Sequence, residues 1–204
     1  MRVTTCKCCG SSVQCVSMKI GVMGARGSFS EKAAEDHIQA NQLDDAIIVP
    51  LVSAEAVLSA IEVDEIDRGI FPIENSNGGI VIEAVHAMAK HRFVVEMMFE
   101  MDVHHMLLVQ PGTTSAQIDT VSSHDQAIKQ CRMYLKRLWP EAHIEPYADT
   151  AKAAEDLSTG VLSATTAVIA PRRCAEMYGL EILEESIQDL KFNFTTFVVA
   201  TKKQ

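Results

Sequence analysis

The residues best suited to chemistry in this chain are polar side chains that directly follow short apolar runs. Glu74, Asn75 and Ser76 come after the apolar run 70–73 and before a pair of glycines. In an α/β protein, side chains at the carboxyl end of a strand and free N–H groups at the start of the next helix face the same loop. The stretch is therefore either a binding loop or an ordinary polar turn. Recurrence of the pattern elsewhere in the chain favours the binding loop.

The recurring feature is a hydroxyl or amide residue where a predicted strand gives way to a predicted helix. These residues are Ser28, Ser53, Asn75 with Ser76, Ser123 and Thr150. Each one alone is explained as a helix cap. If the carboxyl ends of the strands in two sheets face one cleft, however, several helix N-termini point at the same volume. Such a volume suits a small anion.

The sequence offers few signs of any other chemistry. It contains no nucleophile with an adjacent base, no Gly-x-Gly-x-x-Gly fingerprint and no Walker loop. Any reaction would therefore depend on neutral hydrogen-bond donors and on positioning. From the residues alone we expect a two-lobed α/β protein that handles a small carboxylate. An enzyme, a solute-binding module and a ligand-sensing domain all fit that description.

The elements that would position these residues alternate between strand and helix. The first part predicts strands at 19–23, 46–51 and 70–73, and helices from 28 to about 39, from Ser53, and from 80 to about 90. Short connections of this kind are typical of a parallel-rich sheet. The stretch 93–110 predicts two strands that cross into a second lobe.

The second lobe repeats the pattern of the first. It predicts strands at 120–122, 143–146, 167–170 and 181–184, and helices at about 124–137, from Asp149-Thr150 to about 158, and from Pro171 to Gly179. Ser123 and Gln126 have the spacing of a capping box for the first of these helices. A polar approach and a final strand end the chain.

Composition excludes several partners. Hydrophobic residues make up 48% and charged residues 22% of the 204 residues, and the net charge is −9. A negative chain is not suited to nucleic acid or to an anionic membrane surface. No apolar run approaches the roughly 18 residues of a membrane span, and the N-terminus lacks the apolar core of a secretory signal. We therefore expect a cytoplasmic protein.

Four cysteines crowd residues 1–17. Cys6 and Cys9 have the gap of a zinc knuckle, but no further pair follows nearby, so we expect a disordered Cys-rich tail rather than a metal site. His104 and His105 are neighbours on a predicted strand and would point to opposite faces. We accordingly expect no metal ion.

Several motifs resemble those of the prephenate dehydratase catalytic domain, in that family's order and over about residues 18–201. They are Gly24-Ala-Arg-Gly-Ser-Phe-Ser30, Pro72-Ile-Glu-Asn-Ser76, Ser123-His-Asp-Gln-Ala-Ile-Lys-Gln-Cys131, Thr150-Ala151, Tyr178-Gly-Leu180, Ile187-Gln-Asp189 and Asn193-Phe-Thr-Thr-Phe197. The resemblance implies two α/β lobes with a cleft between them, periplasmic-binding-protein-like. Lobe 1 would span about 18–94 plus 190–201, with the last strand returning to it, and lobe 2 about 95–189.

The same resemblance implies conversion of prephenate to phenylpyruvate in phenylalanine biosynthesis, without a cofactor, by a homodimer. It assigns the catalytic positions to Thr195, Asn75, Ser123 and Gln130. Thr195 would donate a hydrogen bond or proton toward the departing ring hydroxyl, and the other three would orient the carboxylates. The substrate-binding positions would be Ser28, Glu74, Ser76, Thr150 and Phe197.

Three departures from the family pattern keep other functions open. Thr196 stands where the family has arginine, and Asp149 stands where it has serine. We also expect no ACT regulatory domain. In both the missing arginine and the expected lack of a regulatory domain, the sequence resembles the prephenate decarboxylases of natural-product pathways. Their reaction leaves the ring hydroxyl in place. Retention of Glu74, Asn75, Ser76 and Thr195 favours the dehydratase, and an impaired small-carboxylate-binding module is the third possibility.

Overall fold

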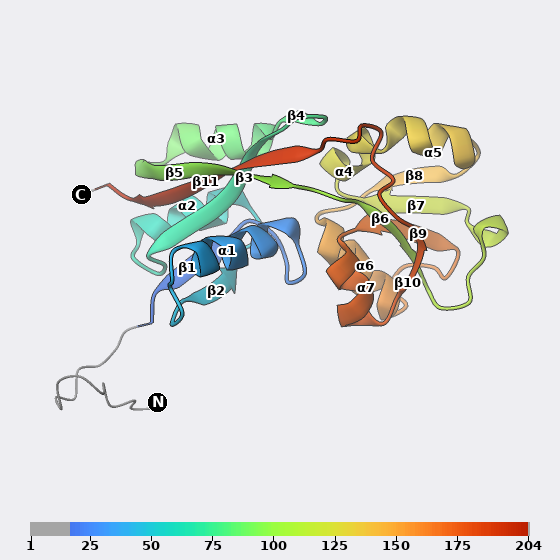
Figure 1. Ribbon diagram of the computed structural model, residues 1–204, viewed down its shortest axis with the longest axis horizontal. Coiled ribbons are helices and arrows are strands. Elements are labelled where there is room, and N and C mark those ends of the chain that lie inside the picture. The colour runs from blue at the N-terminus through green and yellow to red at the C-terminus, as the bar shows by residue number, and fades with distance from the viewer. Residues whose placement is uncertain (1–16, 204) are drawn as a thin grey trace.

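The computed structural model describes residues 17–203 and contains two α/β lobes, each built on its own sheet (Figure 1). This arrangement confirms the expected fold class. Apart from Ser17, the predicted Cys-rich tail and its Cys6–Cys9 spacing lie outside the described residues. Within residues 17–203, none of the helices is long and apolar enough to cross a membrane.

The first sheet has the strand order β2-β1-β3-β11-β5, and a short β4 pairs with β3. The strands are β1 (Lys19–Val22), β2 (Ile47–Pro50), β3 (Arg68–Asn75), β4 (Gly79–Ile80), β5 (Phe93–Asp102) and β11 (Phe194–Lys202). β1 runs parallel to β2 and β3, whereas β11 runs antiparallel to both β3 and β5. The expected return of the last strand to the first lobe is thus confirmed.

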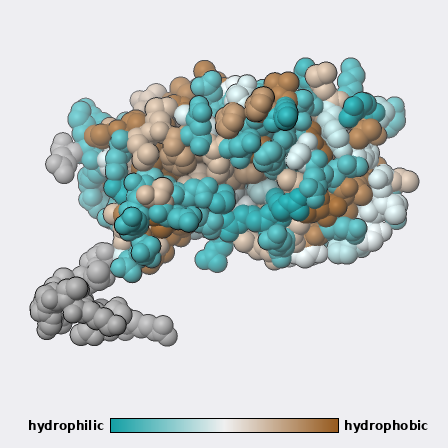
Figure 2. Space-filling model, in the orientation of Figure 1, coloured by the Kyte–Doolittle hydropathy of each residue, from teal (hydrophilic) through white to brown (hydrophobic). Residues whose placement is uncertain are grey.

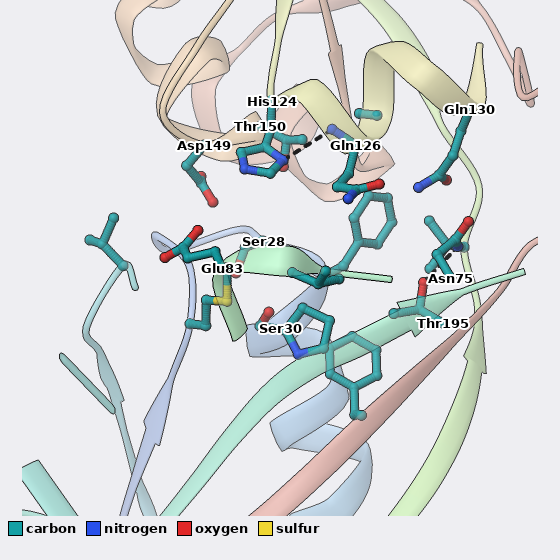
Figure 3. A pocket seen from close by; sticks show the side chains of 18 of the residues that line it. Ser28, Ser30, Asn75, Glu83, His124, Gln126, Gln130, Asp149, Thr150 and Thr195 are labelled. Atoms are coloured by element: carbon teal, nitrogen blue, oxygen red, sulfur yellow. Dashed lines mark hydrogen bonds between the residues drawn. The ribbon is translucent and has the colours of Figure 1, made fainter. Parts of the chain in front are cut away.

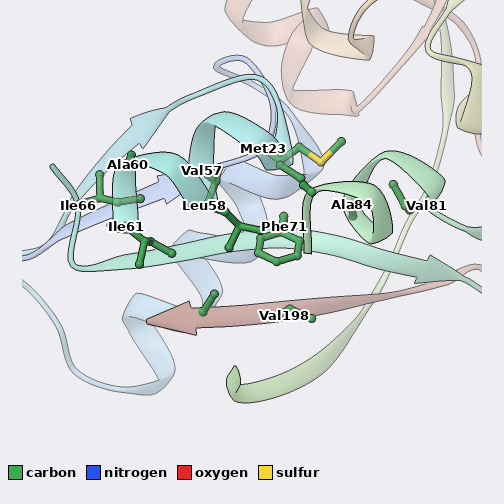
Figure 4. Packing of buried hydrophobic residues seen from close by; sticks show 13 residues of the cluster. Met23, Val57, Leu58, Ala60, Ile61, Ile66, Phe71, Val81, Ala84 and Val198 are labelled. Carbon is green, nitrogen blue, oxygen red and sulfur yellow. The ribbon is translucent and has the colours of Figure 1, made fainter. Parts of the chain in front are cut away.

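Helices cover both faces of the first sheet. α1 (Phe29–Ala40) packs on one face, and α2 (Ala54–Glu62) and α3 (Ile82–Lys90) pack on the other. Successive strand residues point to opposite faces, so Phe71 joins the α2–α3 cluster of Figure 4 while Ile70 joins the α1 cluster. Both side chains are fully buried. This sandwich fixes β3 and β11, which carry the central residues of the site.

The second sheet has the order β10-β6-β9-β7-β8. Its strands are β6 (Met106–Val109), β7 (Thr120–Ser123), β8 (His143–Pro146), β9 (Thr166–Ala170) and β10 (Glu181–Glu184). α4 (Asp125–Gln130) and α5 (Arg132–Leu138) cover one face, and α6 (Thr150–Ser158) and α7 (Arg172–Tyr178) cover the other. A 3₁₀ turn (Ser115–Gln117) precedes β7.

Three sequence predictions about the first lobe are wrong. β5 belongs to the first sheet because it pairs along its length with β11, so the crossing between lobes lies after residue 102 rather than near residue 95. The helix after Asn75 begins at Ile82 instead of Ile80, since Ile80 pairs with Glu74 in β4. Val85 was expected to face inward from that helix and is 40% exposed.

The predicted helix 124–137 is two helices with a break at Cys131. The Asp189 carboxylate accepts hydrogen bonds from the backbone N–H groups of Met133 and Tyr134, both at 2.8 Å. These N–H groups lie in the first turn of α5, where no helical partner exists. A residue 56 positions after Met133 in the sequence therefore caps α5, at the break that separates α5 from α4.

The predicted Ser123–Gln126 capping box is also wrong. His124 is the N-cap of α4, and its Nδ1 accepts from the backbone N–H of Gln126 at 3.3 Å. Ser123 still belongs to β7, and its hydroxyl donates to the Ile169 carbonyl of β9 at 2.6 Å.

Candidate active site

A cavity of about 170 Å³ lies between the lobes, where several helices begin (Figure 3). Residues at or beside the first turns of α1, α2, α3, α4 and α6 line it. Ser28 and Ser53 accept hydrogen bonds from backbone N–H groups of α1 and α2, as their caps were predicted to do. Asp149 caps α6 in the same way. The expected convergence of helix N-termini on one volume is confirmed, and it favours an anionic ligand.

Thr195 and Asn75 form one wall of the cavity and are direct cross-strand partners on β11 and β3. Asn75 Nδ2 donates to Thr195 Oγ1 at 2.9 Å and to Asn193 Oδ1 at 2.8 Å. Both Asn75 and Thr195 are buried. Because Thr195 Oγ1 accepts from Asn75, its own hydroxyl proton is available to a ligand in the cavity.

Asn75 is held in a single orientation by its side-chain oxygen. Asn75 Oδ1 accepts from the backbone N–H groups of Asn77 and Gly78 at 2.9 and 2.7 Å. The amide nitrogen must then face Thr195 and Asn193. The polar loop that follows β3 thereby fixes the donor that orients the Thr195 hydroxyl.

Gln130 carries the network into the second lobe. Its Oε1 accepts from Asn193 Nδ2 at 2.8 Å and lies 2.7 Å from His105 Nε2. Since this oxygen can only accept, neutral His105 carries its proton on Nε2. The Gln130 amide nitrogen remains available and is turned toward the cavity in Figure 3.

His105 is neutral at physiological pH. It is almost fully buried, and this loss of hydration lowers its pKa to about 4, although the contact with Gln130 opposes the shift. The ring also packs edge-on against Phe29, with 5.3 Å between centroids. His105 therefore acts here as a fixed neutral donor that orients Gln130.

The opposite end of the cavity is acidic. In Figure 3 the Asp149 and Glu83 carboxylates point toward one another, away from Asn75, Gln130 and Thr195. None of the described residues that line the cavity is lysine or arginine. The site thus combines neutral donors at one end with two carboxylates at the other.

The structure brings together six of the nine predicted site residues. Ser28, Asn75, Gln130, Thr150, Thr195 and Phe197 line the cavity. Thr196 does not, which agrees with the alternation expected along the last strand.

The other three predicted residues lie outside the lining. Ser123 is fully buried behind the cavity wall, on the Ile169 carbonyl. Ser76 is exposed and fastens the end of β3 to β11, because its Oγ accepts from the Phe194 N–H at 3.0 Å. Glu74 is exposed on β3, opposite Thr196.

Sequence reasoning missed several residues of the site. Asn193 is fully buried and joins Asn75 to Gln130. For His105 the sequence predicts only that it binds no metal ion together with His104, and no role in the site. Glu83 and His124 also line the cavity. For Asn193 and His124 the available signal was their position within the motifs quoted above. His105 and Glu83 carry no local signal.

Comparisons with known proteins agree with this geometry. The family model for prephenate dehydratase matches residues 20–204. Arogenate dehydratase 5 of Arabidopsis thaliana is 34% identical over 186 residues, which are 91% of this chain and 42% of that protein. The bifunctional chorismate mutase/prephenate dehydratase of Stutzerimonas stutzeri is 29% identical over 182 residues, 89% and 48% of the two chains. The chain therefore spans somewhat less than half the length of these curated relatives.

Solved structures give the same assignment. Prephenate dehydratase from Arthrobacter aurescens, crystallised with L-Phe, superposes with a TM-score of 0.77 at 26% identity. The match covers 92% of this chain and 60% of that one. On the strength of the family model and these relatives, the chain belongs to the prephenate dehydratase family.

Proposed function

We propose that this protein is a carbon–oxygen lyase that converts prephenate to phenylpyruvate, in aromatic amino-acid biosynthesis. The observation that carries the proposal is the buried Thr195 hydroxyl, which accepts from Asn75 and so keeps its own proton available to a ligand in a cavity ringed by helix N-termini. Membership of the family supports the same reaction.

In this reaction the bond from the ring to its carboxylate breaks and carbon dioxide leaves. The bonding electrons aromatise the ring, and the C–O bond to the ring hydroxyl breaks. The leaving oxygen gathers negative charge, which a hydrogen bond from Thr195 stabilises. The departing hydroxide takes a proton, which solvent supplies, and leaves as water.

Asn75 and Gln130 supply the orientation. Asn75 holds Thr195 Oγ1, and the Gln130 amide nitrogen donates to a substrate oxygen. Ser28 and Thr150 bind substrate oxygens beside the first turns of α1 and α6. Ser123, Ser76 and Glu74 act from outside the cavity, by supporting the strands that form it.

Incubation of the purified protein with prephenate, followed by NMR, tests the reaction. Phenylpyruvate formed faster than the spontaneous background supports the dehydratase. A non-aromatic dihydro-4-hydroxyphenylpyruvate would identify a decarboxylase instead. Binding of prephenate without any product would leave a small-carboxylate-binding module.

The acidic end of the cavity favours a second candidate substrate. Arogenate carries an ammonium group where the prephenate side chain has a ketone, and several of the relatives are arogenate dehydratases. Asp149 and Glu83 would attract that ammonium group, whereas the prephenate ketone offers them no positive charge; both compounds carry the same two carboxylates. Product formation from each compound, compared as kcat/KM, decides between them.

We also propose a cytosolic, homodimeric protein. A reducing compartment suits Cys131 and Cys174, which are buried and unpaired within the described part of the chain. Burial raises the pKa of both thiols well above its usual range, so they are unreactive packing residues.

A further inference from the structure

The loop 24–27 belongs to the first lobe in sequence but packs against the second. Ala25 lies against the apolar cluster that α6 and α7 form with their sheet. A Cβ atom added at Gly27 would come within 3.1 Å of Cys174 Sγ on α7 and 3.7 Å of Ala151 Cβ on α6. The backbone of the loop is therefore in close contact with both helices, and it bridges the two lobes beside the cavity.

Two side chains of α7 bind the backbone of this loop. The Tyr178 hydroxyl donates to the Arg26 carbonyl at 3.2 Å, and the Cys174 thiol donates to the Gly27 carbonyl at 3.5 Å. Figure 1 shows the loop between α1 and the second lobe. The second lobe thus holds the carbonyl groups of the loop.

Glu31 holds the same loop from α1. Its Oε2 accepts from the Gly27 N–H at 2.7 Å, and its own N–H donates to the Ser28 hydroxyl at 3.2 Å. The two bonds resemble a capping box, in which the cap and the third helical residue fix each other. Glu31 therefore helps to set where Ser28, a residue of the cavity lining, is held.

Arg173 of α7 joins Glu31 to the second lobe. Its Nη2 lies 3.3 Å from Glu31 Oε2, and its Nη1 donates to Glu35 Oε2 at 3.0 Å. The Glu31 side chain is only 12% exposed, so this ion pair is screened less than one at the open surface. In Figure 2 hydrophilic residues, in teal, run from the region of α1 toward the second lobe.

These contacts act on one end of the cavity. Ser28 lies beside Asp149, because a Cβ atom added at Gly24 would come within 2.5 Å of Ser28 Oγ and 3.4 Å of Asp149 Oδ2. Asp149 is the N-cap of α6, the helix that packs beside α7 in the same apolar cluster. The Thr195 hydroxyl is held separately, by Asn75 within the first lobe.

We propose that Arg173 is a positioning residue for substrate binding. Through Glu31 it holds the Ser28 end of α1 against the second lobe, so that the N-termini of α1 and α6 bind the same anionic ligand. The inference rests on the proposed function, since the ligand is the substrate of that site. Loss of Arg173 displaces Ser28 and leaves the Thr195 hydroxyl in place, so it lowers affinity more than the rate of conversion.

Steady-state kinetics with prephenate test this division. Arg173→Gln should raise KM about tenfold or more, because a contact between charged groups is lost, while kcat changes less than about threefold. Arg173→Lys keeps the charge and should restore much of the affinity. Arg172→Gln is the matched control on α7, because the Arg172 ion pair with Glu185 lies within the second lobe. An unchanged KM, or a fall in kcat equal to the fall in kcat/KM, would overturn the proposal.

Glu31→Gln tests the route from Arg173 to the loop. Glutamine still accepts from the Gly27 N–H but offers Arg173 no charge. The rise in KM should approach that of Arg173→Gln, and the double variant should add little to it. Glu35→Gln leaves Glu31 in place and should have a smaller effect. Additive effects of the Arg173 and Glu31 changes would refute the route.

Hydrogen exchange of the ligand-free protein separates this inference from the proposed reaction. Arg173→Gln should speed exchange of the amides in residues 24–32 about fivefold or more, with exchange in β3 unchanged, and Arg172→Gln should do neither. If the loop responds in this way and wild-type protein does not convert prephenate, the proposed reaction fails and the role of Arg173 in holding the loop stands. Unchanged exchange in Arg173→Gln would overturn that role whatever the reaction. Circular dichroism confirms that each variant is folded.

Discussion

Asn75 and Thr195 are 120 residues apart in sequence and directly opposite each other on β3 and β11, with 2.9 Å between Nδ2 and Oγ1. The hydrogen bond fixes the Thr195 oxygen as an acceptor and leaves its proton for a ligand.

Removing the Thr195 hydroxyl should slow turnover. Thr195→Ala is expected to lower kcat by roughly 10²-fold or more, because the leaving oxygen loses its hydrogen-bond donor. Thr195→Ser keeps the hydroxyl and should retain much more activity. Steady-state kinetics with prephenate measures both, and Thr196→Ala serves as the control because Thr196 lies outside the cavity lining. Equal, mild effects of both Thr195 changes would make it a packing residue.

Restoring the family arginine at position 196 should act on stability. Thr196 lies opposite Glu74 on β3 and Glu100 on β5, and both carboxylates are exposed. Thr196→Arg is expected to add a cross-strand ion pair of about 0.5–1 kcal/mol, which raises Tm by about 1–4 °C. Thr196→Gln adds no charge and should not raise Tm. The specificity constant should change less than threefold. A hundredfold rise in phenylpyruvate formation at unchanged Tm would instead place this residue on the substrate.

His105 should make the fold sensitive to acid. Its pKa falls from 6.5 to about 4 on folding because the ring is buried. Between these values the unfolded chain binds a proton that the folded chain excludes, so the free energy of unfolding decreases as pH falls through this window. The full pKa shift corresponds to a loss of about 3 kcal/mol in the free energy of unfolding.

Urea unfolding at pH 7, 5.5 and 4.5 measures this loss. His105→Gln should flatten the pH dependence, while the exposed His143→Gln should leave it unchanged. Part of the pH dependence should remain in His105→Gln, because burial also lowers the pKa of His37. If His105→Gln kept the wild-type pH dependence of the free energy of unfolding, protonation of His105 would not contribute to the loss of stability.

Asp149 should set the preference between the two candidate substrates. Asp149→Asn removes the charge and keeps the cap on the Ala151 and Lys152 N–H groups, because asparagine is an equally good N-cap. We expect the ratio of kcat/KM for arogenate to that for prephenate to fall at least tenfold. Asp149→Ser, which introduces the family residue, should shift it in the same direction. If the ratio stayed constant, Asp149 would not determine which substrate is preferred, and the proposed reaction would still stand.

The sequence by itself determined the features that depend on neighbours a few residues apart. The Ser28 and Ser53 caps are three residues from the N–H groups they bind, and Gly179 ends α7 as predicted, in the left-handed conformation that glycine adopts without strain. The facing of Thr195 and Phe197 into the cavity follows from the two-residue period of a strand. Local backbone geometry fixes these features, regardless of which other elements the helix or strand packs against.

The tertiary structure decided the features that depend on residues far apart in sequence. Asp189 caps α5 at the break in the predicted long helix, although it lies 56 residues after Met133 in the sequence. Asn193 joins Asn75 to Gln130 only because β11 returns beside β3, and His105 reaches Gln130 only because β6 lies beneath α4. The order of strands in a sheet sets which distant polar groups meet, and each buried polar group must find a partner there. No local pattern around those residues contains that information.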